Sequence, residues 1–230
     1  MKIAVVGIEN FPLGKKNVVD ERLDKLAPLY RSQKITSIQI EFQDASHIKD
    51  TDAILCDNAS KLDLILADLE SVEQRLLKED AQELFKRCKE ALEKETPLNE
   101  LSFSEEERKI LINSNLITLK PITFIDSKNM GAIPQVIKET YYNSGMISFF
   151  TGGEKEARAW PIKKLTSALE AAGIIHSDLQ RGFIKAEVVS YEDLIKAGGT
   201  NQAKNAGLLK LQDKDYQVKD GDIILFKFNV

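Results

Sequence analysis

The residues best placed to do chemistry lie near the start of the chain, where a short apolar run from Lys2 ends at Gly7. A glycine that follows such a run can open a phosphate-binding loop of the form G-x-x-x-x-G-K-[ST]. Backbone N–H groups of that loop wrap the phosphates, its lysine meets their charge and its hydroxyl holds magnesium. Counted from Gly7, the second glycine position holds Pro12, which has no N–H, and the lysine position holds Leu13. The loop therefore lacks two groups that phosphate binding needs.

A shifted alignment recovers a glycine and a lysine but lengthens the loop and supplies no hydroxyl. It also leaves only residues 17–19 before the next recognisable segment, with no room for a helix whose amino terminus faces the phosphates. We therefore interpret the loop as degenerate and expect no bound cofactor. A rearranged loop that still binds ATP or GTP is the alternative. The positions concerned are Gly7, Asn10, Pro12, Leu13, Gly14 and Lys15.

No other group of residues predicts catalysis or a metal site. His176, Ser177 and Asp178 have the residue types of a hydrolytic triad, but such triads are normally assembled from distant segments. Asp178 or Ser177 is better explained as a turn or helix cap. Cys56 and Cys88 lie in dissimilar segments without metal-ligand spacing, so we interpret both as structural thiols, with redox sensitivity as the alternative. We expect no catalytic residues.

The amino-terminal part has the pattern of a small α/β unit. Residues 2–7, 38–42 and 53–55 are strand-like, and residues 20–29 place Leu23, Leu26 and Ala27 at helical spacing. Residues 120–125 predict a further strand, and residues 133–142 a helix leading into the last part of the chain.

Residues 62–95 repeat apolar side chains at helical spacing, and Lys78-Glu79-Asp80 interrupts the phase. This pattern predicts either two helical arms that turn back on each other or one kinked helix. Acidic residues outnumber basic ones over residues 61–109. The segment is therefore either a solvated helical face or an arm that docks a protein.

The last part of the chain has the pattern of a compact α+β unit. Residues 147–150 and 157–162 are strand-like and flank Gly152-Gly153, which suits a hairpin turn. Ser167 and Glu170 fit a capping box, and Gly173 predicts the end of that helix. Residues 185–190 predict another strand, and Ile224, Phe226 and Phe228 predict one face of a terminal strand. This part is long enough to have a core of its own.

Several runs of residues carry a family resemblance. Residues 146–160 (MISFFTGGEKEARAW), 174–188 (IIHSDLQRGFIKAEV) and 220–230 (DGDIILFKFNV) strongly resemble the carboxy-terminal TGS domain of the YchF (Obg-like) P-loop ATPase family. Residues 20–26 resemble the family's segment after switch I, and residues 40–44 resemble the strand that leads into its DxxG motif. Residues 64–76 resemble the start of its coiled-coil insertion. The resemblance implies a β-grasp, ubiquitin-like fold for the last part.

Against the family's pattern, the nucleotide motifs are altered beyond the phosphate loop. The DxxG position has His47 in Asp44-Ala45-Ser46-His47, and the base-recognition asparagine falls on Ser127. We interpret His47 as an ordinary surface residue. These changes predict a member that has lost nucleotide hydrolysis and is not an enzyme. We expect it to act as a binding or adaptor module.

The expected domain organisation combines α/β with α+β. Residues 1–61 and 110–145 would form a reduced P-loop-like α/β domain, residues 62–109 a helical, coiled-coil hairpin insertion, and residues 146–230 the TGS domain. The resemblance implies ribosome or structured-RNA binding through the TGS domain, and the helical hairpin is a candidate for a protein partner. The RNA or partner candidates are Lys163, Lys164, Arg181 and Lys185.

Composition agrees with this reading. The chain has 230 residues, 43% of them hydrophobic, and a formal net charge of -4, so its bulk charge indicates neither DNA specificity nor a membrane surface. No apolar run approaches the roughly 18 residues of a membrane span. We expect a cytoplasmic protein.

Overall fold

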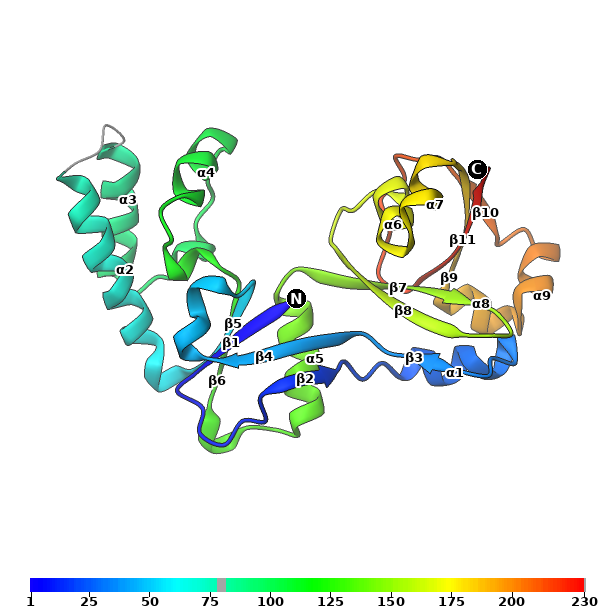
Figure 1. Ribbon diagram of the computed structural model, residues 1–230, viewed down its shortest axis with the longest axis horizontal. Coiled ribbons are helices and arrows are strands. Elements are labelled where there is room, and N and C mark those ends of the chain that lie inside the picture. Colours follow the sequence, from blue (N-terminus) through cyan, green and yellow to red (C-terminus); the bar gives the residue numbers. More distant parts are fainter. Residues whose placement is uncertain (78–81, 230) are drawn as a thin grey trace. The chain divides into compact units, whose positions relative to one another are not determined.

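The computed structural model describes residues 1–77 and 82–229, and the chain divides into two compact units. Unit 1 consists of Met1–Lys16 and Ile40–Ser144, and unit 2 of Asn17–Gln39 and Gly145–Val230. Figure 1 follows the chain through both units. The longer segment of unit 2 begins at Gly145. Residues 17–39, however, belong to unit 2 and not to the α/β part in which the sequence placed them.

Unit 1 is built on a five-stranded sheet in the order β2-β4-β1-β5-β6. β1 pairs in parallel with both β4 and β5, and β5 pairs in parallel with β6. β1 and β5 are almost fully buried, as expected for the centre of a parallel sheet. The strands are β1 (Lys2–Val6), β2 (Gly14–Asn17), β4 (Gln39–Asp44), β5 (Ala53–Asp57) and β6 (Ile122–Ile125), and helix α5 (Ile133–Asn143) follows β6.

The helical part of unit 1 has its own core. α2 (Lys61–Leu76) packs against α3 (Gln82–Glu93), and α4 (Glu105–Ile112) lies near them with the short helices η3 (Leu98–Glu100) and η4 (Ile117–Leu119). Of the two alternatives from the sequence, two separate helices are found. The expected break at Lys78-Glu79-Asp80 lies outside the described residues. Figure 1 shows α2 and α3 side by side, in cyan to blue-green.

A buried carboxylate joins α2 to the segment that returns to the sheet. Asp68 is 1% exposed and accepts hydrogen bonds from the backbone N–H groups of Ile117 (2.7 Å) and Thr118 (2.6 Å) and from the Thr118 hydroxyl (2.6 Å). Burial raises the pKa of this carboxyl. Asp68 lies within the buried stripe of Ile65 and Val72, so the sequence does carry a signal here: a charged residue on an apolar helix face.

Unit 2 is built on a six-stranded sheet in the order β10-β9-β11-β7-β8-β3. Its main core lies on one face, under α6 (Ala168–Ile175), where Phe149, Ala171 and Phe226 are buried together. The strands are β3 (Ile35–Thr36), β7 (Met146–Gly152), β8 (Ala157–Lys163), β9 (Phe183–Ser190), β10 (Lys210–Gln212) and β11 (Asp222–Phe228). The other helices of this part are α7 (Ser177–Arg181), α8 (Tyr191–Ala197) and α9 (Thr200–Asn205).

Residues 17–39 cover the opposite face of that sheet. Successive residues of a strand point to opposite faces, so Phe150 faces away from the core that holds Phe149. Helix α1 (Glu21–Tyr30) packs on this second face, and the guanidinium of Arg22 lies 4.9 Å from the centre of the Phe150 ring. Figure 1 shows α1 and α6 on opposite sides of the β7–β8 ribbon. β3 then adds an edge strand beside β8.

Arg22 fixes α1 to the sheet through charge. It forms ion pairs with Asp20 (2.8 Å) and with Asp220 (2.7 Å), and Asp220 also accepts a hydrogen bond from the Ser148 backbone N–H (2.8 Å). Asp20 is also the N-cap of α1. A sequence pattern cannot show this link, because Arg22 and Asp220 are separated by nearly the whole chain.

Two local expectations in unit 2 are wrong. Gly173 does not end its helix, since α6 continues to Ile175. A Cβ at Gly173 would lie 2.7 Å from the side chain of Gln180, so the glycine serves close packing instead. Phe228 does not share the buried face of Ile224 and Phe226: it is 46% exposed, because the strand register shifts between Lys227 and Phe228. The capping box of Ser167 and Glu170 is confirmed.

Candidate functional site

The loop after β1 is shaped by its packing against the start of α2. Gly7 has φ +70°, and a Cβ there would lie 2.1 Å from the Ser60 hydroxyl oxygen. Asn10 also has a positive φ, of 58°. Phe11 is buried against Phe42, with ring centroids 4.9 Å apart, which anchors the loop in the core of unit 1. Gly7 is thus explained by a close approach of the chain to itself.

The loop leads into a strand instead of a helix. Within residues 1–77 and 82–229, β1 is followed by β2, and the next helix, α1, lies in unit 2. Leu13 and Lys15 are exposed, and Pro12 is half-buried. Gly14 and Lys15 are the first residues of β2. The helix amino terminus that favours a phosphate at such a loop is therefore not supplied by the segment after β1.

Three aspartates lie at the carboxyl ends of parallel strands of one sheet, β4, β5 and β6, and each accepts hydrogen bonds there. Asp44 accepts from the Ser46 hydroxyl and backbone N–H, Asp57 from the Ser127 hydroxyl (2.7 Å), and Asp126 from the Asn129 side-chain amide (2.6 Å). These hydrogen bonds hold the pKa of each of the three carboxyls below its usual value. Ser127 thus ties the end of β6 to the end of β5.

The two histidines lie in local, exposed arrangements. His47 Nδ1 lies 3.5 Å from an Asp44 carboxylate oxygen and 3.1 Å from the Ser46 hydroxyl, within the short helix η1 (Ala45–Asp50). His176 caps α7 by accepting a hydrogen bond from the Asp178 backbone N–H (3.1 Å), so the cap is the histidine and not Ser177 or Asp178. No group of His, Cys, Asp and Glu in the described part of the chain could hold a metal ion.

Both cysteines are free and buried. Burial raises the pKa of the Cys56 thiol to about 12 and that of the Cys88 thiol to about 11. Since the thiolate is the reactive form, neither thiol is prepared for nucleophilic chemistry at neutral pH.

The four basic candidates from the sequence do not form one surface. Ala159 is level with Phe150, and Phe150 with Ile223, across the sheet of unit 2. Lys163 follows Ala159 along β8, which runs antiparallel to β7. Lys185 pairs with Lys227, which follows Ile223 along β11, and β11 runs parallel to β7. Lys163 and Lys185 therefore lie toward opposite ends of the sheet. Roughly 25 Å of strand length separates the two lysines.

The two ends also differ in ion pairing. Lys185 pairs with Asp213, and Arg181 pairs with Asp178. Within residues 1–77 and 82–229, the structure gives no side-chain ion pair for Lys163, Lys164 or Lys219. Lys219 was not among the sequence candidates. It lies next to the loop that follows β8, because the Val218 backbone N–H donates to the Thr166 carbonyl oxygen (3.0 Å).

Comparison with known proteins places this architecture. Residues 146–229 match the family model YchF-GTPase_C, described as a protein of unknown function (DUF933). The Ribosome-binding ATPase YchF of Bacillus subtilis (strain 168) is 32% identical over 326 residues, an alignment that covers 95% of this chain and 89% of the relative. The chain belongs to the YchF and Obg-like ATPase family. Because the alignment is longer than the chain, YchF has stretches with no counterpart here.

Other relatives agree. Obg-like ATPase 1 of Homo sapiens is 42% identical over 135 residues, which covers 59% of this chain and 31% of the relative. The solved structure of the Schizosaccharomyces pombe YchF GTPase superposes with a TM-score of 0.80 at 20% sequence identity and covers 99% of this chain and 97% of that chain. The mixed α/β fold with two sheets is therefore the YchF fold.

The names of these relatives contradict the expectation that the chain is not an enzyme. YchF and Obg-like ATPase 1 are named as ATPases, and the S. pombe protein as a GTPase. The expectation rested on residue types at a few motif positions. Family membership rests on the chain as a whole, so it points to an enzyme.

No helix in the described ranges is long and apolar enough to cross a bilayer.

Proposed function

We propose that this chain binds ribosomes in the cytoplasm, and that unit 2, as a TGS-type β-grasp domain, makes the contact with structured RNA. The bacterial relatives are named ribosome-binding ATPases, which supports the ribosome as partner. Binding does not require a nucleotide at the loop after β1, since that loop runs into a strand and is anchored by Phe11. The helical segment of residues 61–109, in which acidic residues outnumber basic ones, remains a candidate for a protein partner.

The observation that carries the RNA contact is a cluster of lysines at one end of the unit 2 sheet, Lys163, Lys164 and Lys219. We call them the loop-end lysines. They are exposed, and within the described residues the structure gives them no side-chain ion pair, although Lys219 lies close enough to the buried Asp222 to attract its charge. Lysines of this kind can neutralise RNA phosphates and release condensed counterions without first breaking an ion pair.

The loop that carries two of these lysines is held in one conformation. The Thr166 hydroxyl donates to the Lys163 carbonyl oxygen (2.7 Å), and the Lys164 backbone N–H donates to the Gly145 carbonyl oxygen (2.9 Å). Leu165, between them, is 73% exposed and has φ +69°, a region that costs a residue with a Cβ roughly 1–2 kcal/mol. A fixed loop loses little conformational entropy on binding, which favours its use as a contact surface.

Co-sedimentation with ribosomes at increasing salt tests the proposal. Binding of the parent should weaken as salt rises, with a slope of log K against log salt of roughly −2 to −3 if three phosphates are contacted. The triple variant K163E/K164E/K219E should lose binding, and R181E/K185E, whose residues lie at the other end of the sheet, is the matched control and should bind nearly as well as the parent. Thermal melts should show that both variants keep the fold, because exposed charges contribute little to stability.

Magnesium with ATP, added to the same assay, should leave the affinity unchanged. If the triple variant binds as tightly as the parent, the loop-end lysines are not the contact. A requirement for ATP would contradict the nucleotide-independent part of the proposal alone.

A further inference from the structure

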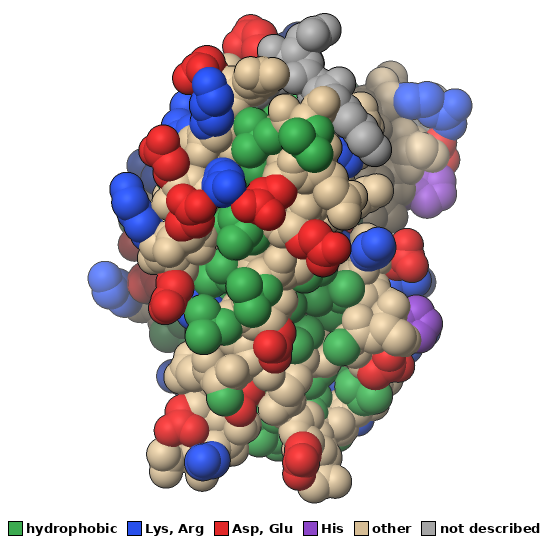
Figure 2. Space-filling model, turned by 90° about the vertical axis from the view of Figure 1, so that its left-hand side faces the viewer, with side chains coloured by type: hydrophobic (Ala, Val, Ile, Leu, Met, Phe, Trp, Pro, Cys, Tyr) green, Lys and Arg blue, Asp and Glu red, His purple; other side chains and the backbone are tan. Residues whose placement is uncertain are grey.

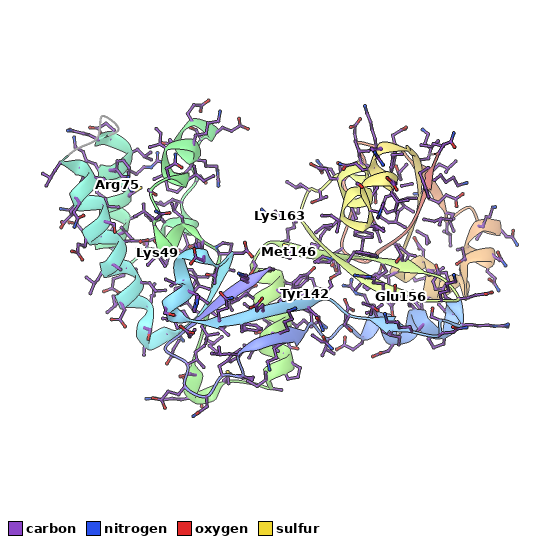
Figure 3. All side chains as sticks on the ribbon, in the orientation of Figure 1. Lys49, Arg75, Tyr142, Met146, Glu156 and Lys163 are labelled. Carbon is purple, nitrogen blue, oxygen red and sulfur yellow. The ribbon has the colours of Figure 1, made fainter. Side chains whose placement is uncertain are left out.

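Unit 1 contains a polar cleft of about 480 Å³ between α2, η1 and the turn that follows α4. α2 contributes Ser71, Gln74 and Arg75, η1 contributes Lys49, and the turn contributes Ser114 and Asn115. Figure 3 labels Lys49 and Arg75, which extend from two different elements in this part of the molecule. The volume is within the range of pockets that bind small molecules.

The cleft is distinct from the edge of the sheet at which Gly7, Asp57 and Asp126 lie. Those residues follow the carboxyl ends of β1, β5 and β6. Lys49 precedes the amino end of β5, and Asn115 precedes the amino end of β6. Because these strands are parallel, their amino ends share the opposite edge of the sheet. The cleft therefore does not belong to the motif positions discussed above.

The cleft offers positive charge and hydrogen-bond donors. Among residues 1–77 and 82–229, the ammonium of Lys49 and the side-chain amides of Gln74 and Asn115 make no hydrogen bond or ion pair with the protein. Arg75 is oriented by donating to the Ser114 carbonyl oxygen (3.0 Å) and by lying 5.9 Å from the centre of the Phe85 ring. An oriented guanidinium and an ammonium on facing elements suit an oxyanion.

Among the described residues that line the cleft, the single acidic side chain, Asp68, already has hydrogen-bond partners. Both Asp68 oxygens accept hydrogen bonds from the segment at Ile117 and Thr118, and burial raises its pKa. Its charge therefore opposes that of Lys49 and Arg75 only in part. An anion that entered the cleft would meet Lys49, Arg75 and the side-chain amides of Gln74 and Asn115.

We propose that this cleft binds a small molecule that carries a phosphate group. The phosphate lies between Lys49 and Arg75, and Gln74 and Asn115 donate hydrogen bonds from opposite walls. A cleft of this volume also has room for a group the size of a sugar beyond the phosphate. The proposal concerns unit 1 and is independent of the RNA contact proposed for unit 2.

Isothermal titration of the full chain with ribose 5-phosphate, ribose and inorganic phosphate provides the test. Nucleotides are left out of the probes, because the relatives are ATPases. Ribose 5-phosphate should bind saturably, inorganic phosphate more weakly and ribose not at all. Lys49→Glu should weaken binding at least tenfold, and Lys49→Arg, which keeps the charge, should bind within about threefold of the parent.

Two variants keep this result specific. Gln74→Glu adds a negative charge in the cleft without removing a hydrogen bond of the folded chain, and should also weaken binding at least tenfold. Lys94→Glu makes the same charge change as Lys49→Glu, but Lys94 is an exposed residue directly after α3 and does not line the cleft. This variant should bind like the parent. Equal loss in Lys94→Glu would mean general electrostatic attraction and would overturn the proposal.

Two further outcomes would also overturn it. One is the absence of any heat or chemical-shift change with ribose 5-phosphate at millimolar concentration. The other is binding of a single-stranded RNA oligonucleotide, lost in Lys49→Glu, without binding of either small phosphate. That result would assign the lysine to a nucleic-acid surface instead.

Discussion

Each unit joins two segments that are far apart in the sequence, and the two units do so by different chemistry. Unit 2 holds residues 17–39 through a charged link at Arg22 and through apolar contact with the second face of its sheet. Unit 1 ties α2 to the segment before β6 through Asp68, a carboxylate that accepts from backbone N–H groups. Unit 2 pairs opposite charges near its surface, and unit 1 buries a single charge among neutral donors.

The difference matters because burial acts differently on the two arrangements. Desolvation by itself lowers the pKa of Arg22, but hydrogen bonds and ion pairs with Asp20 and Asp220 outweigh it and raise the pKa, so Arg22 stays charged. The hydrogen-bond partners of Asp68 among the described residues are neutral, and desolvation raises its pKa. Stability of unit 1 should therefore respond to mild acid, whereas the Arg22 link should not. Figure 2 shows apolar side chains exposed among acidic and basic ones on one face of the molecule. Leu62 and Leu66 of α2 are two exposed apolar residues of unit 1.

The largest effect should follow from removing residues 17–39 from unit 2. A fragment of residues 145–230 exposes the sheet face around Phe150 and loses the contacts of Leu23 and Leu26, which are each 2% exposed. Buried side chains of this size contribute roughly 1.5–3 kcal/mol each, so the fragment should lose about 5 kcal/mol or more relative to one that keeps residues 17–39 through a flexible linker. Urea unfolding of the two fragments measures this difference.

The linked fragment is the control for the cut ends. The sequence alone led us to expect a core of its own for residues 146–230, because their pattern gives no sign that the second sheet face needs a cover. A cooperative transition of equal midpoint in both fragments would show that residues 17–39 are peripheral to unit 2.

Asp68 should give the next largest effect. Asp68→Ala leaves two backbone N–H groups and the buried Thr118 hydroxyl without their partner, and each unsatisfied group costs roughly 1–3 kcal/mol, so we expect a loss of about 3 kcal/mol. Urea unfolding measures it. Asp222→Ala, which removes a buried carboxylate that accepts from Lys219 N–H and Tyr216 O–H in unit 2, is the matched comparison.

Asp68→Asn tests the direction of the pH effect. Because burial raises the pKa of Asp68 in the folded chain, the native state binds the proton more tightly than the unfolded chain does. The contribution of this carboxyl to stability then falls as pH rises from the usual pKa of Asp, about 4, through the raised value. The parent should therefore lose stability relative to Asp68→Asn as pH rises above about 4. If the parent instead gains stability relative to Asp68→Asn as pH rises, hydrogen bonding to the carboxylate outweighs desolvation.

Local patterns in the sequence predicted the elements but not their assignment to units. The strand at β1, the helix at α1 and the capping box of α6 follow from periodicity and caps, which are properties of neighbouring residues. The pairing of Arg22 with Asp220 depends on the fold as a whole. The same holds for the candidate lysines: composition counted Lys163 and Lys185 together, and only the strand register places them at opposite ends of the sheet.

The smallest effect concerns Gly7, where sequence and structure give different reasons for a glycine. Gly7→Ala must adopt φ +70° and brings its Cβ to 2.1 Å from the Ser60 hydroxyl oxygen, so it should cost about 2 kcal/mol, of which roughly half is backbone strain. Ser60→Gly removes the obstructing side chain at a helix end where it makes no capping hydrogen bond, and should cost only a few tenths of a kcal/mol. The double variant should recover about 1 kcal/mol relative to the sum of the single losses, measured as a coupling free energy in urea unfolding. Gly131→Ala, where a Cβ meets nothing within 4 Å, is the control and should be nearly neutral. If the two substitutions prove additive, the approach of Ser60 is not what requires a glycine at this position, and the left-handed backbone alone accounts for it.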